Sequence, residues 1–389
     1  MKIRSVKGSV FGPILCGFFL TSCVAQELAT ERVIGKLEVV AAFASPMPTG
    51  VTVANSGRIF VNFPKWGDDV QYTVAEVKGN ETIPYPNAAI NHYVSGDDQS
   101  TKLVSVQSVV VDSTGNRLWI VDTGSIGFGP TSPGGPKLIA VDLKTDQIVK
   151  KITFPADVAL STSYLNDVRF DLRRGAQGMA FLTDSTSSGP NGIVVVDLAS
   201  GKSWRRLHDH PTTKPDPNFA PVVEGEILQM RLPGKPPAKF AVGSDGIAIS
   251  PDGRTLYYCP LTSRHLYSVS VDALADQTKS DAEVASTVKD LGEKGGASDG
   301  LESDAEGRVY LTDYEHNAIR RRDVSGEFET IAHDLRLLWP DTLSLAANGY
   351  LYVTANQVER QAVFHNGQDL RQKPYVLFRV KVDGTRIRN

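Results

Sequence analysis

The amino-acid sequence predicts an all-β protein, a six-bladed β-propeller whose ring is closed by pairing of its N-terminal and C-terminal strands. Three observations lead to this prediction. A unit of two short β-type runs joined by a turn occurs six times along the chain. Unmatched β-type runs stand at both ends, and no long stretch with helical periodicity competes with them. Repeated units of this size are typical of propeller blades.

Each copy of the repeat opens with a polar residue and continues with four to six β-branched or aromatic residues, a turn and a second β-type run. The copies cover residues 48–61, 106–122, 165–184, 244–258, 298–313 and 340–354. Asp, Asn and Gly occupy the turns, and these residues tolerate the positive φ of a tight hairpin. A third alternating run follows several copies, for example at 137–142 and 192–197. Each copy therefore predicts a blade of several short strands.

The two ends of the chain carry the remaining β-type runs, at residues 35–43 and 375–382. We expect the first of these to complete the last blade, because a ring closed in this way leaves no long free edge. The segment from 64 to 96 is too long for a hairpin loop. We expect it to cover the central channel or to pack across blades.

The first 25 residues read as a targeting segment. Lys2, Arg4 and Lys7 precede an apolar stretch of about ten residues, which fits a signal peptide and is too short for a membrane span. Residues 20–23 (LTSC) resemble a bacterial lipobox, in which Cys23 carries lipid. This interpretation gives a signal peptide over 1–22, an exported linker over 23–35 and a propeller domain over 36–389. The alternative is ordinary cleavage before Gln26.

Both interpretations export the protein, either as a periplasmic or cell-surface lipoprotein or as a secreted protein. In the first case its membrane contact is through the lipid anchor only. The 389 residues are 41% hydrophobic, which is enough for a large core. The net charge of −3 argues against a nucleic-acid binder that depends on phosphate contacts. We expect the protein to be a monomer. We also expect Cys259 to be buried in the core as a small hydrophobic residue.

The polar residue that heads each repeat is expected to point at the propeller axis. These residues are Thr49, Gln107, Asn166, Asp245, Asp299 and Asp341, with Asp167 as a further candidate. Converging carboxylates repel unless a positive charge lies among them, and an oxygen-only set suits a hard divalent cation, Ca²⁺ above all. The alternative is that these residues cap strand turns and bind water.

Several motifs resemble the yellow and major royal jelly protein family, in particular its bacterial members. They are residues 60–66 (FVNFPKW), 84–86 (PYP), 117–124 (RLWIVDTG), 245–251 (DGIAISP) and 256–261 (LYYCPL). The resemblance covers essentially the whole chain after the targeting segment. It implies a six-bladed propeller and a small-molecule ligand in the central channel; insect members bind ligands, and some are associated with dopachrome conversion.

A more distant resemblance is to the regucalcin and gluconolactonase hydrolases, in which Glu, Asn and Asp hold a divalent ion. It implies a metal site of Asn166, Asp245 and Asp299, with Asp299 or Asp245 as catalytic base. Substrate would contact Asn166, Gln107 and Asp341. The family's Glu position carries Thr49, so one charged ligand is replaced by a neutral one.

Three functions follow as hypotheses. The first is a metal-dependent, lactonase-like hydrolase in which a metal-bound water attacks an ester carbon. The second is a ligand-binding protein without catalysis. The third is a surface scaffold, since propellers serve many functions and the fold does not decide between them.

Overall fold

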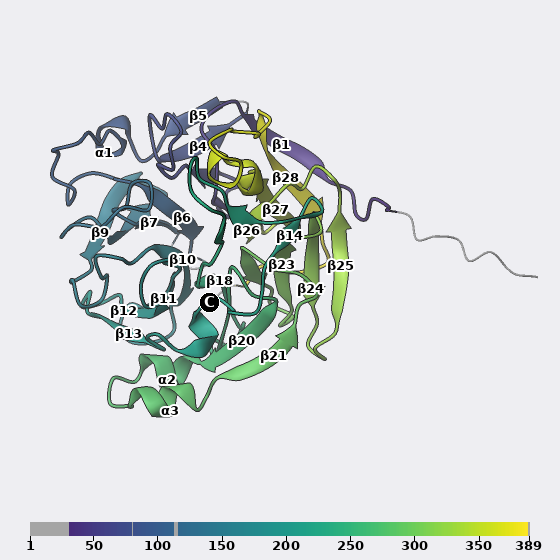
Figure 1. Cartoon of the computed structure of the whole chain (residues 1–389). Coiled ribbons are helices and arrows are strands. Elements are labelled where there is room, and N and C mark those ends of the chain that lie inside the picture. Colours follow the sequence, from purple (N-terminus) through teal and green to yellow (C-terminus); the bar gives the residue numbers. More distant parts are fainter. Residues whose placement is uncertain (1–30, 80, 113–115, 388–389) are drawn as a thin grey trace, which may run out of the picture. The chain divides into compact units, whose positions relative to one another are not determined.

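The computed structural model describes residues 31–79, 81–112 and 116–387. Within these ranges, the residues from Val33 onward form one compact unit with six four-stranded antiparallel sheets in a ring (Figure 1). The six-bladed propeller is thus confirmed. The signal peptide over 1–22, the lipidation site Cys23 and residues 24–30 of the linker lie outside the described residues.

Five blades are built from strands that follow one another along the chain. Blade 1 contains β2 (Val51–Val53), β3 (Ile59–Asn62), β4 (Val74–Lys78) and β5 (Glu81–Pro84). Blade 2 contains β6 (Val106–Val111), β7 (Arg117–Asp122), β8 (Lys137–Asp142) and β9 (Gln147–Thr153). Blade 3 contains β10 (Leu165–Asp171), β11 (Met179–Asp184), β12 (Gly192–Asp197) and β13 (Ser203–Arg206). Blade 4 contains β18 (Ser244–Ile249), β19 (Thr255–Pro260), β20 (His265–Ser270) and β21 (Lys289–Glu293). Blade 5 contains β22 (Leu301–Ser303), β23 (Val309–Asp313), β24 (Ala318–Arg322) and β25 (Phe328–His333).

Blade 6 joins the two ends of the chain. It contains β26 (Pro340–Leu345), β27 (Tyr350–Ala355), β28 (Tyr375–Lys381) and β1 (Glu38–Phe43). β1 runs antiparallel to β28, with Phe43 opposite Tyr375 and Glu38 opposite Arg379. The Glu38 carboxylate also accepts hydrogen bonds from the Arg379 guanidinium, at 2.8 Å from Nη2. The expected closure of the ring is confirmed.

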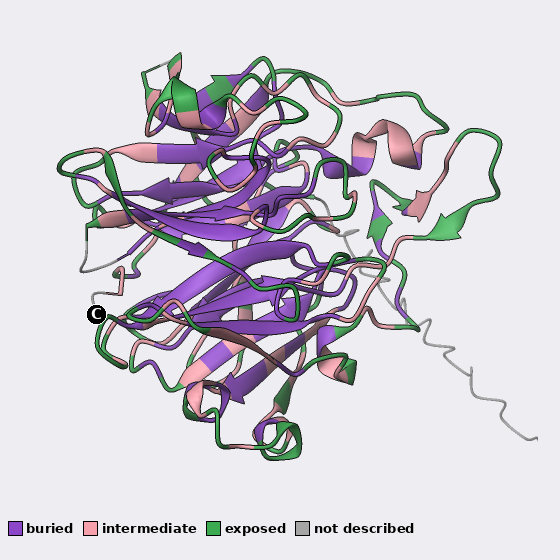
Figure 2. Ribbon diagram, turned by 90° about the vertical axis from the view of Figure 1, so that its left-hand side faces the viewer, coloured by how far each residue is buried: buried purple, intermediate pink, exposed green. Residues whose placement is uncertain are grey.

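The first strand of each blade is the innermost. These strands contact one another in a closed cycle, β2–β6–β10–β18–β22–β26–β2, and so surround a central channel. They are largely buried (Figure 2), and polar side chains within them, such as Asn166 and Asp167 of β10, are buried as well. The core lies between neighbouring blades; Trp119 of blade 2, for example, packs on Phe170 of blade 3 with ring centroids 5.1 Å apart. Cys259 is buried in this core, as expected.

The expected turn chemistry is present in the hairpins between first and second strands. Gly253 and Gly349 have φ of 69° and 72°, a conformation that glycine adopts without steric cost.

Of the two expectations for residues 64–96, packing across blades is confirmed for several side chains of the segment. The segment contains β4, β5 and the short helix α1 (Ala88–Asn91), so it completes blade 1 instead of covering the channel. Trp66 Nε1 donates a hydrogen bond to the Tyr164 hydroxyl of blade 3 at 2.7 Å. The Tyr85 hydroxyl donates to Asp146 of blade 2 at 2.7 Å, and Asp68 pairs with Arg371 of the segment between β27 and β28 at 2.8 Å.

Besides the segment that carries α1, three insertions interrupt the repeat in the described part of the chain. The first insertion (residues 207–243) joins blades 3 and 4 and contains the 3₁₀-helix η1 (Pro211–Thr213), β14 (Val222–Val223), β15 (Glu226–Ile227), β16 (Gln229–Met230) and β17 (Ala238–Lys239). The second insertion (residues 356–374) lies between β27 and β28 and contains the 3₁₀-helices η2 (Val358–Arg360) and η3 (Ala362–Phe364). The third lies between β20 and β21 and contains α2 (Val271–Ala275) and α3 (Asp281–Ala285).

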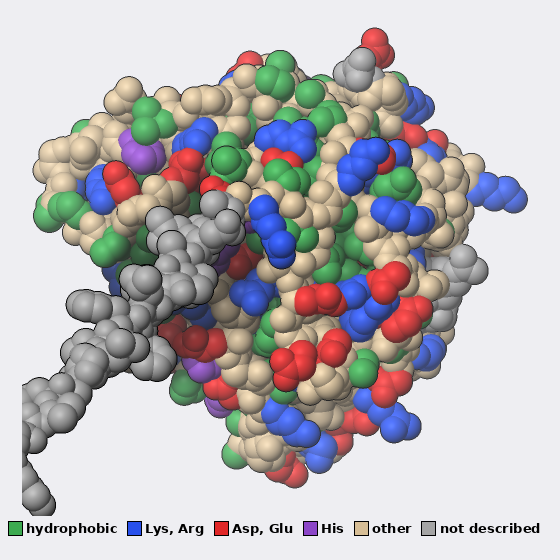
Figure 3. All heavy atoms as spheres, turned by 90° about the vertical axis from the view of Figure 1, so that its right-hand side faces the viewer, with side chains coloured by type: hydrophobic (Ala, Val, Ile, Leu, Met, Phe, Trp, Pro, Cys, Tyr) green, Lys and Arg blue, Asp and Glu red, His purple; other side chains and the backbone are tan. Residues whose placement is uncertain are grey.

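The surface over β25 carries interspersed acidic and basic side chains (Figure 3). Arg321 of the neighbouring strand β24, for instance, pairs with Glu329 and Asp383. None of the helices in the described part of the chain has the length and apolar character that a bilayer span requires.

Candidate functional site

β-Bulges aim the predicted polar residues at the channel. In four of the inner strands the pairing register slips where the polar residue stands. A bulge leaves a residue out of the ladder and turns its side chain to a new direction, which is why bulges often border functional sites. The residues in these bulges are Gln107, Asn166, Asp245 and Asp341.

Two glycines allow neighbouring inner strands to approach each other closely. A Cβ on Gly246 would overlap the backbone oxygen of Asp299, and a Cβ on Gly300 would overlap that of Asp341. The Asp-Gly pairs therefore let each inner strand pass directly against the polar residue of the next blade. This close approach gathers Asp245, Asp299 and Asp341 into one group, which we call the acid cluster.

The acid cluster is buried and lacks a basic partner. Its three side chains belong to residues that are only 6%, 9% and 3% exposed. Asp245 accepts a hydrogen bond from the Asn166 amide, Asp299 accepts one from Trp339 Nε1 at 2.7 Å, and Asp341 accepts one from Asn356 Nδ2 at 2.6 Å. No lysine or arginine in the described ranges forms an ion pair with any of the three carboxylates.

The electrostatics of the cluster follow from this arrangement. Burial raises the pKa of Asp299 to about 6, and the charge of Asp167 acts in the same direction. Burial also raises the pKa values of Asp245 and Asp341 well above the ordinary aspartate value, with the Asp299 charge adding to the effect in both. Such a group holds protons unless a cation compensates its charge.

Tyr164 borders the acid cluster. Its hydroxyl donates to Gln107 Oε1 at 2.9 Å and accepts from Trp66 Nε1 at 2.7 Å. Burial raises its pKa well above the ordinary tyrosine value, and the charges of Asp245 and Asp341 add to this. Tyr164 is therefore a neutral hydrogen-bonding group under all ordinary conditions.

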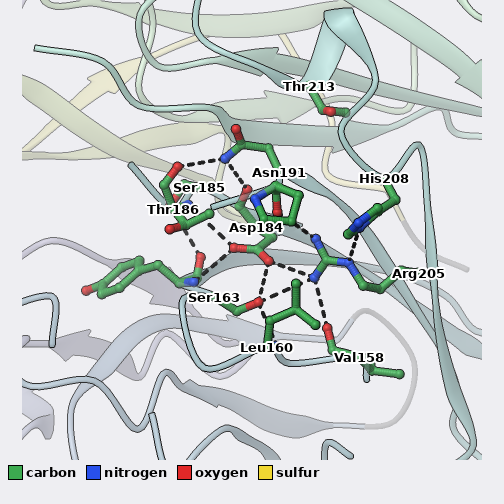
Figure 4. Close-up of polar contacts among 12 residues, drawn as sticks. Val158, Leu160, Ser163, Asp184, Ser185, Thr186, Asn191, Arg205, His208 and Thr213 are labelled. Atoms are coloured by element: carbon green, nitrogen blue, oxygen red, sulfur yellow. Dashed lines mark hydrogen bonds and ion pairs between the residues drawn. The ribbon is translucent and has the colours of Figure 1, made fainter. Parts of the chain in front are cut away.

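A buried ion pair in blade 3 holds Tyr164 in place (Figure 4). Asp184 Oδ1 accepts a hydrogen bond from the Tyr164 amide at 2.9 Å, and Oδ2 accepts from Ser163 Oγ at 2.6 Å and Arg205 Nη1 at 2.7 Å. Arg205 also donates to the Val158 carbonyl at 2.8 Å. These contacts hold both ends of the loop from Val158 to Tyr164, and they place Tyr164 beside the channel.

Two of the predicted candidates have other roles. The Thr49 hydroxyl accepts from Asn62 Nδ2 at 2.8 Å and donates to the Gln107 carbonyl at 3.3 Å, so protein partners already satisfy it. Asp167 accepts from Ser108 Oγ at 2.6 Å and pairs with the Arg169 guanidinium at 2.8 Å. The uncompensated carboxylates are thus those of the acid cluster.

The described residues provide no ready-made metal centre. Across residues 31–79, 81–112 and 116–387, no group of three or more His, Cys, Asp or Glu side chains is arranged to hold a metal ion. Thr49, which the distant resemblance to the hydrolases aligns with a metal-binding carboxylate, has a hydroxyl that is already bonded to Asn62 and Gln107. The charge of the acid cluster suits a cation, but the described carboxylates are not arranged as a set of metal ligands.

A cavity of about 80 Å³ lies at the other end of the inner strands. Its lining includes Arg169, Glu302 and Arg386. Arg386 donates to the carbonyls of Val53 and Val111, both at 2.6 Å, and so joins blades 1 and 2 at that end. The two ends of the channel therefore differ, one acidic and one bridged by arginine.

Sequence reasoning did not identify Tyr164, Trp339 and Asn356, all of which contact predicted site residues. A signal for two of them is present in the sequence. Tyr164 and Trp339 each stand two positions before a predicted polar residue, Asn166 and Asp341. Residues i and i+2 share one face of a strand, so an aromatic side chain there accompanies the polar one.

The sequence is similar to that of a known protein family and of several individual proteins. The family model described as major royal jelly protein matches residues 104–384. The protein yellow of Drosophila erecta is 27% identical over 252 residues, which are 60% of this chain and 43% of that protein. The protein yellow of Drosophila subobscura is 28% identical over the same length, 41% of that protein. The chain thus spans less than half the length of these relatives.

Solved structures show the same fold at low sequence identity. A calcium-binding protein, regucalcin, from Agrobacterium tumefaciens has a TM-score of 0.53 and 15% identity, over 91% of this chain and 98% of that one. A gluconolactonase from Xanthomonas campestris has a TM-score of 0.51 and 12% identity, over 89% of both chains. At these identities the likeness establishes the propeller architecture alone.

Proposed function

The chain belongs to the major royal jelly protein family, and from this premise we propose that it is an exported propeller that binds a small cationic molecule at the acid cluster. One observation carries the proposal: Asp245, Asp299 and Asp341 are buried together without a basic partner among the described residues. Uncompensated buried charge is costly, and a cation entering the cluster offsets that cost.

A second observation supports a ligand with hydrogen-bond donors. Asn356 is fully buried, and its Oδ1 has no hydrogen-bond partner among the described residues, although its Nδ2 bonds Asp341. A buried acceptor without a donor is unfavourable by about 1–3 kcal/mol. An ammonium group satisfies both needs, because it brings a positive charge and three donors.

Calorimetry on the mature protein tests the proposal. The probe is ethanolamine, and ethylene glycol is the matched control because a hydroxyl replaces the ammonium group. At pH 8 the acid cluster is more fully ionised than at lower pH, so ethanolamine should bind there and raise the melting temperature, while ethylene glycol should do neither. Asp299→Asn should weaken ethanolamine binding. Absence of ethanolamine binding, or equal binding of both probes, contradicts the proposal.

A divalent-metal-dependent, lactonase-like hydrolase is the second candidate. The fold likeness to a calcium-binding regucalcin and to a gluconolactonase favours it. Asn166, Asp245 and Asp299 would have to rearrange to hold the ion, with Asp299 or Asp245 as base and with Gln107 and Asp341 toward substrate. Titration with Ca²⁺, Mg²⁺, Mn²⁺ and Zn²⁺, followed by an assay on glucono-δ-lactone, separates this function from amine binding. If neither ethanolamine nor a divalent metal ion binds, the result favours the hypothesis of a surface scaffold.

A further inference from the structure

The first and second insertions meet each other across the channel end that holds the acid cluster. Two backbone hydrogen bonds join them, from Arg231 N to the Val363 carbonyl and from Asn366 N to the Arg231 carbonyl, both at 2.8 Å. The Arg360 guanidinium adds a two-bonded ion pair with Glu224, with Nε 2.9 Å from Oε2. We call the joined insertions the lid.

The lid contacts the acid cluster directly. The second insertion begins at Asn356, whose amide donates to Asp341. In the first insertion, Phe240 packs edge-on against Trp339, with ring centroids 6.4 Å apart, and Trp339 in turn donates to Asp299. Phe240 also packs on Phe364 of the second insertion at 5.2 Å. These contacts explain why the carboxylates are shielded from solvent.

The lid is built from short elements. Its four strands have two residues each, and η2 and η3 have three each. Val222 and Ile227 are exposed at its edge. Figure 2 shows short strands of this kind standing out to one side of the buried blades. Opening of the lid separates the contacts that Val223, Leu228 and Phe364 make in a buried apolar cluster with Trp339. It breaks none of the hydrogen-bonded ladders between blade strands, because the lid strands pair only with one another, so the lid can open while the blades stay folded.

Glu359 of η2 lies buried within the lid without a hydrogen-bonding partner. The residue is 4% exposed, and neither carboxylate oxygen has such a partner among the described residues. The charged and titratable groups around it are Arg360, with Nε 3.7 Å from Glu359 Oε1, and Glu224 of the facing insertion. The His365 ring is bonded to the Glu359 carbonyl at 2.9 Å. The Arg360 guanidinium is bonded through two nitrogens to Glu224. It therefore compensates little of the negative charge that Glu359 would carry when ionised.

We propose that the two insertions form a pH-sensitive lid over the acid cluster, closed while Glu359 is protonated and opened when Glu359 ionises. The pH-dependent opening of the lid does not depend on a ligand. Its role in controlling ligand access rests on the proposed function. Ligand access is then greatest at neutral and alkaline pH, where the acid cluster is also most negative.

The direction of the pH effect follows from linkage. Burial raises the pKa of Glu359 to about 7, with the Glu224 charge adding to the shift, against an ordinary value of 4.5. In the open lid the carboxyl is hydrated and has the ordinary value, so the closed form binds the proton more tightly. The equilibrium constant for opening should rise about tenfold per pH unit between 4.5 and about 7, roughly 300-fold in all, and level off above that.

Hydrogen exchange measured by mass spectrometry between pH 5 and 8 tests this on the mature protein. After correction for the intrinsic pH dependence of exchange, protection of peptides from 222–242 and 356–370 should fall as pH rises. Peptides from β7 serve as the internal control and should keep their protection. Glu359→Gln, which mimics the protonated form, should abolish the pH dependence, and Glu359→Met provides a second neutral side chain should Gln disturb folding.

Two further variants separate Glu359 from its neighbours. His365→Asn keeps the carboxyl and should keep the pH dependence, while Arg360→Ala removes the ion pair between the insertions and should lower protection at every pH. A pH-independent lid, or a dependence that survives in both neutral Glu359 variants, overturns the proposal. If the lid behaves as proposed but ethanolamine does not bind, the proposed function fails and the lid stands.

Discussion

Two buried aspartates in this protein have opposite surroundings. Asp122 is fully buried and pairs with the equally buried Lys137, with Oδ2 2.7 Å from Nζ, and it also accepts backbone hydrogen bonds from Val104 and Ser105. Asp299 accepts a hydrogen bond from an indole and otherwise faces other carboxylates. The first arrangement stabilises an ionised carboxylate, and the second disfavours it.

We expect Asp299→Asn to stabilise the ligand-free protein at pH 8 and to have little effect at pH 4. The pKa of Asp299 is raised from 3.8 to about 6 in the fold. A carboxyl with a raised pKa contributes stability that is present below the unfolded value and is lost as pH rises through the folded value. The loss is on the order of 3 kcal/mol, and the neutral amide avoids it. Denaturant unfolding at pH 4, 6 and 8 measures the difference between variant and wild type.

Asp122→Asn is the matched control for this experiment. It leaves Lys137 buried without its carboxylate, and breaking a buried pair in this way costs about 3–5 kcal/mol. The same substitution should therefore have opposite signs at the two positions at pH 8. Equal destabilisation at both would show that Asp299 is compensated by a group other than those described.

The blades are the part of the molecule that the sequence predicts well. In the repeats, local chemistry and fold agree: β-branched runs, Asp and Gly in the turns and one polar residue at a constant register specify each inner strand. The acid cluster follows from that register, although its closeness depends on Gly246 and Gly300, whose role becomes visible only when the next blade is placed against them.

The remaining elements were less predictable because tertiary contacts decide them. In β4, the buried Glu76 interrupts the apolar run, and its ion pair with Arg58 is a long-range contact that no local pattern reveals. The lid strands are two residues long, which is too short for a periodic signal. The loop that carries Tyr164 is set by the ion pair between Asp184 and Arg205, residues 21 apart in the sequence.

Ring closure depends on one strand, and its removal should unfold the whole propeller. A chain that begins at residue 44 lacks β1, exposes the edge of β28 and loses the buried side chains of Leu37, Ala41 and Phe43. Burial of one large apolar side chain is worth about 1.5–3 kcal/mol, so the loss of strand and core together is comparable with the stability of a whole domain.

A chain that begins at residue 31 keeps β1 and is the control for this truncation. We expect it to melt like the mature protein, while the chain that begins at residue 44 should show a much lower melting temperature or no cooperative transition. Unchanged melting after loss of β1 would contradict the role of this strand in closing the ring.

At the scale of the whole molecule, the channel has a lid at its acidic end and an arginine bridge at the other. Arg386 ties blades 1 and 2 together near the far cavity. We expect the proposed ligand to enter through the lid, because the lid lies at the end that holds the acid cluster. The strand ladders of the blades form the frame, and the two insertions can move without breaking these ladders, although the movement separates apolar contacts with Trp339. In the proposed function, the ligand would enter and leave without opening of the ring.

Export and anchoring are the remaining whole-molecule prediction, and they rest on residues 20–23. Lipid on Cys23 would tether the propeller through residues 24–33, because Ile34 is already bonded to His333 of blade 5; these residues span at most about 35 Å when fully extended. Cys23→Ala should therefore move the protein from the membrane to a soluble exported fraction without changing its melting temperature, because the substitution lies outside the propeller. Fractionation with labelled palmitate, together with sequencing of the mature N-terminus, measures the outcome. A wild-type mature chain that starts at Gln26, with fractionation unchanged by the substitution, would instead establish ordinary signal-peptide cleavage.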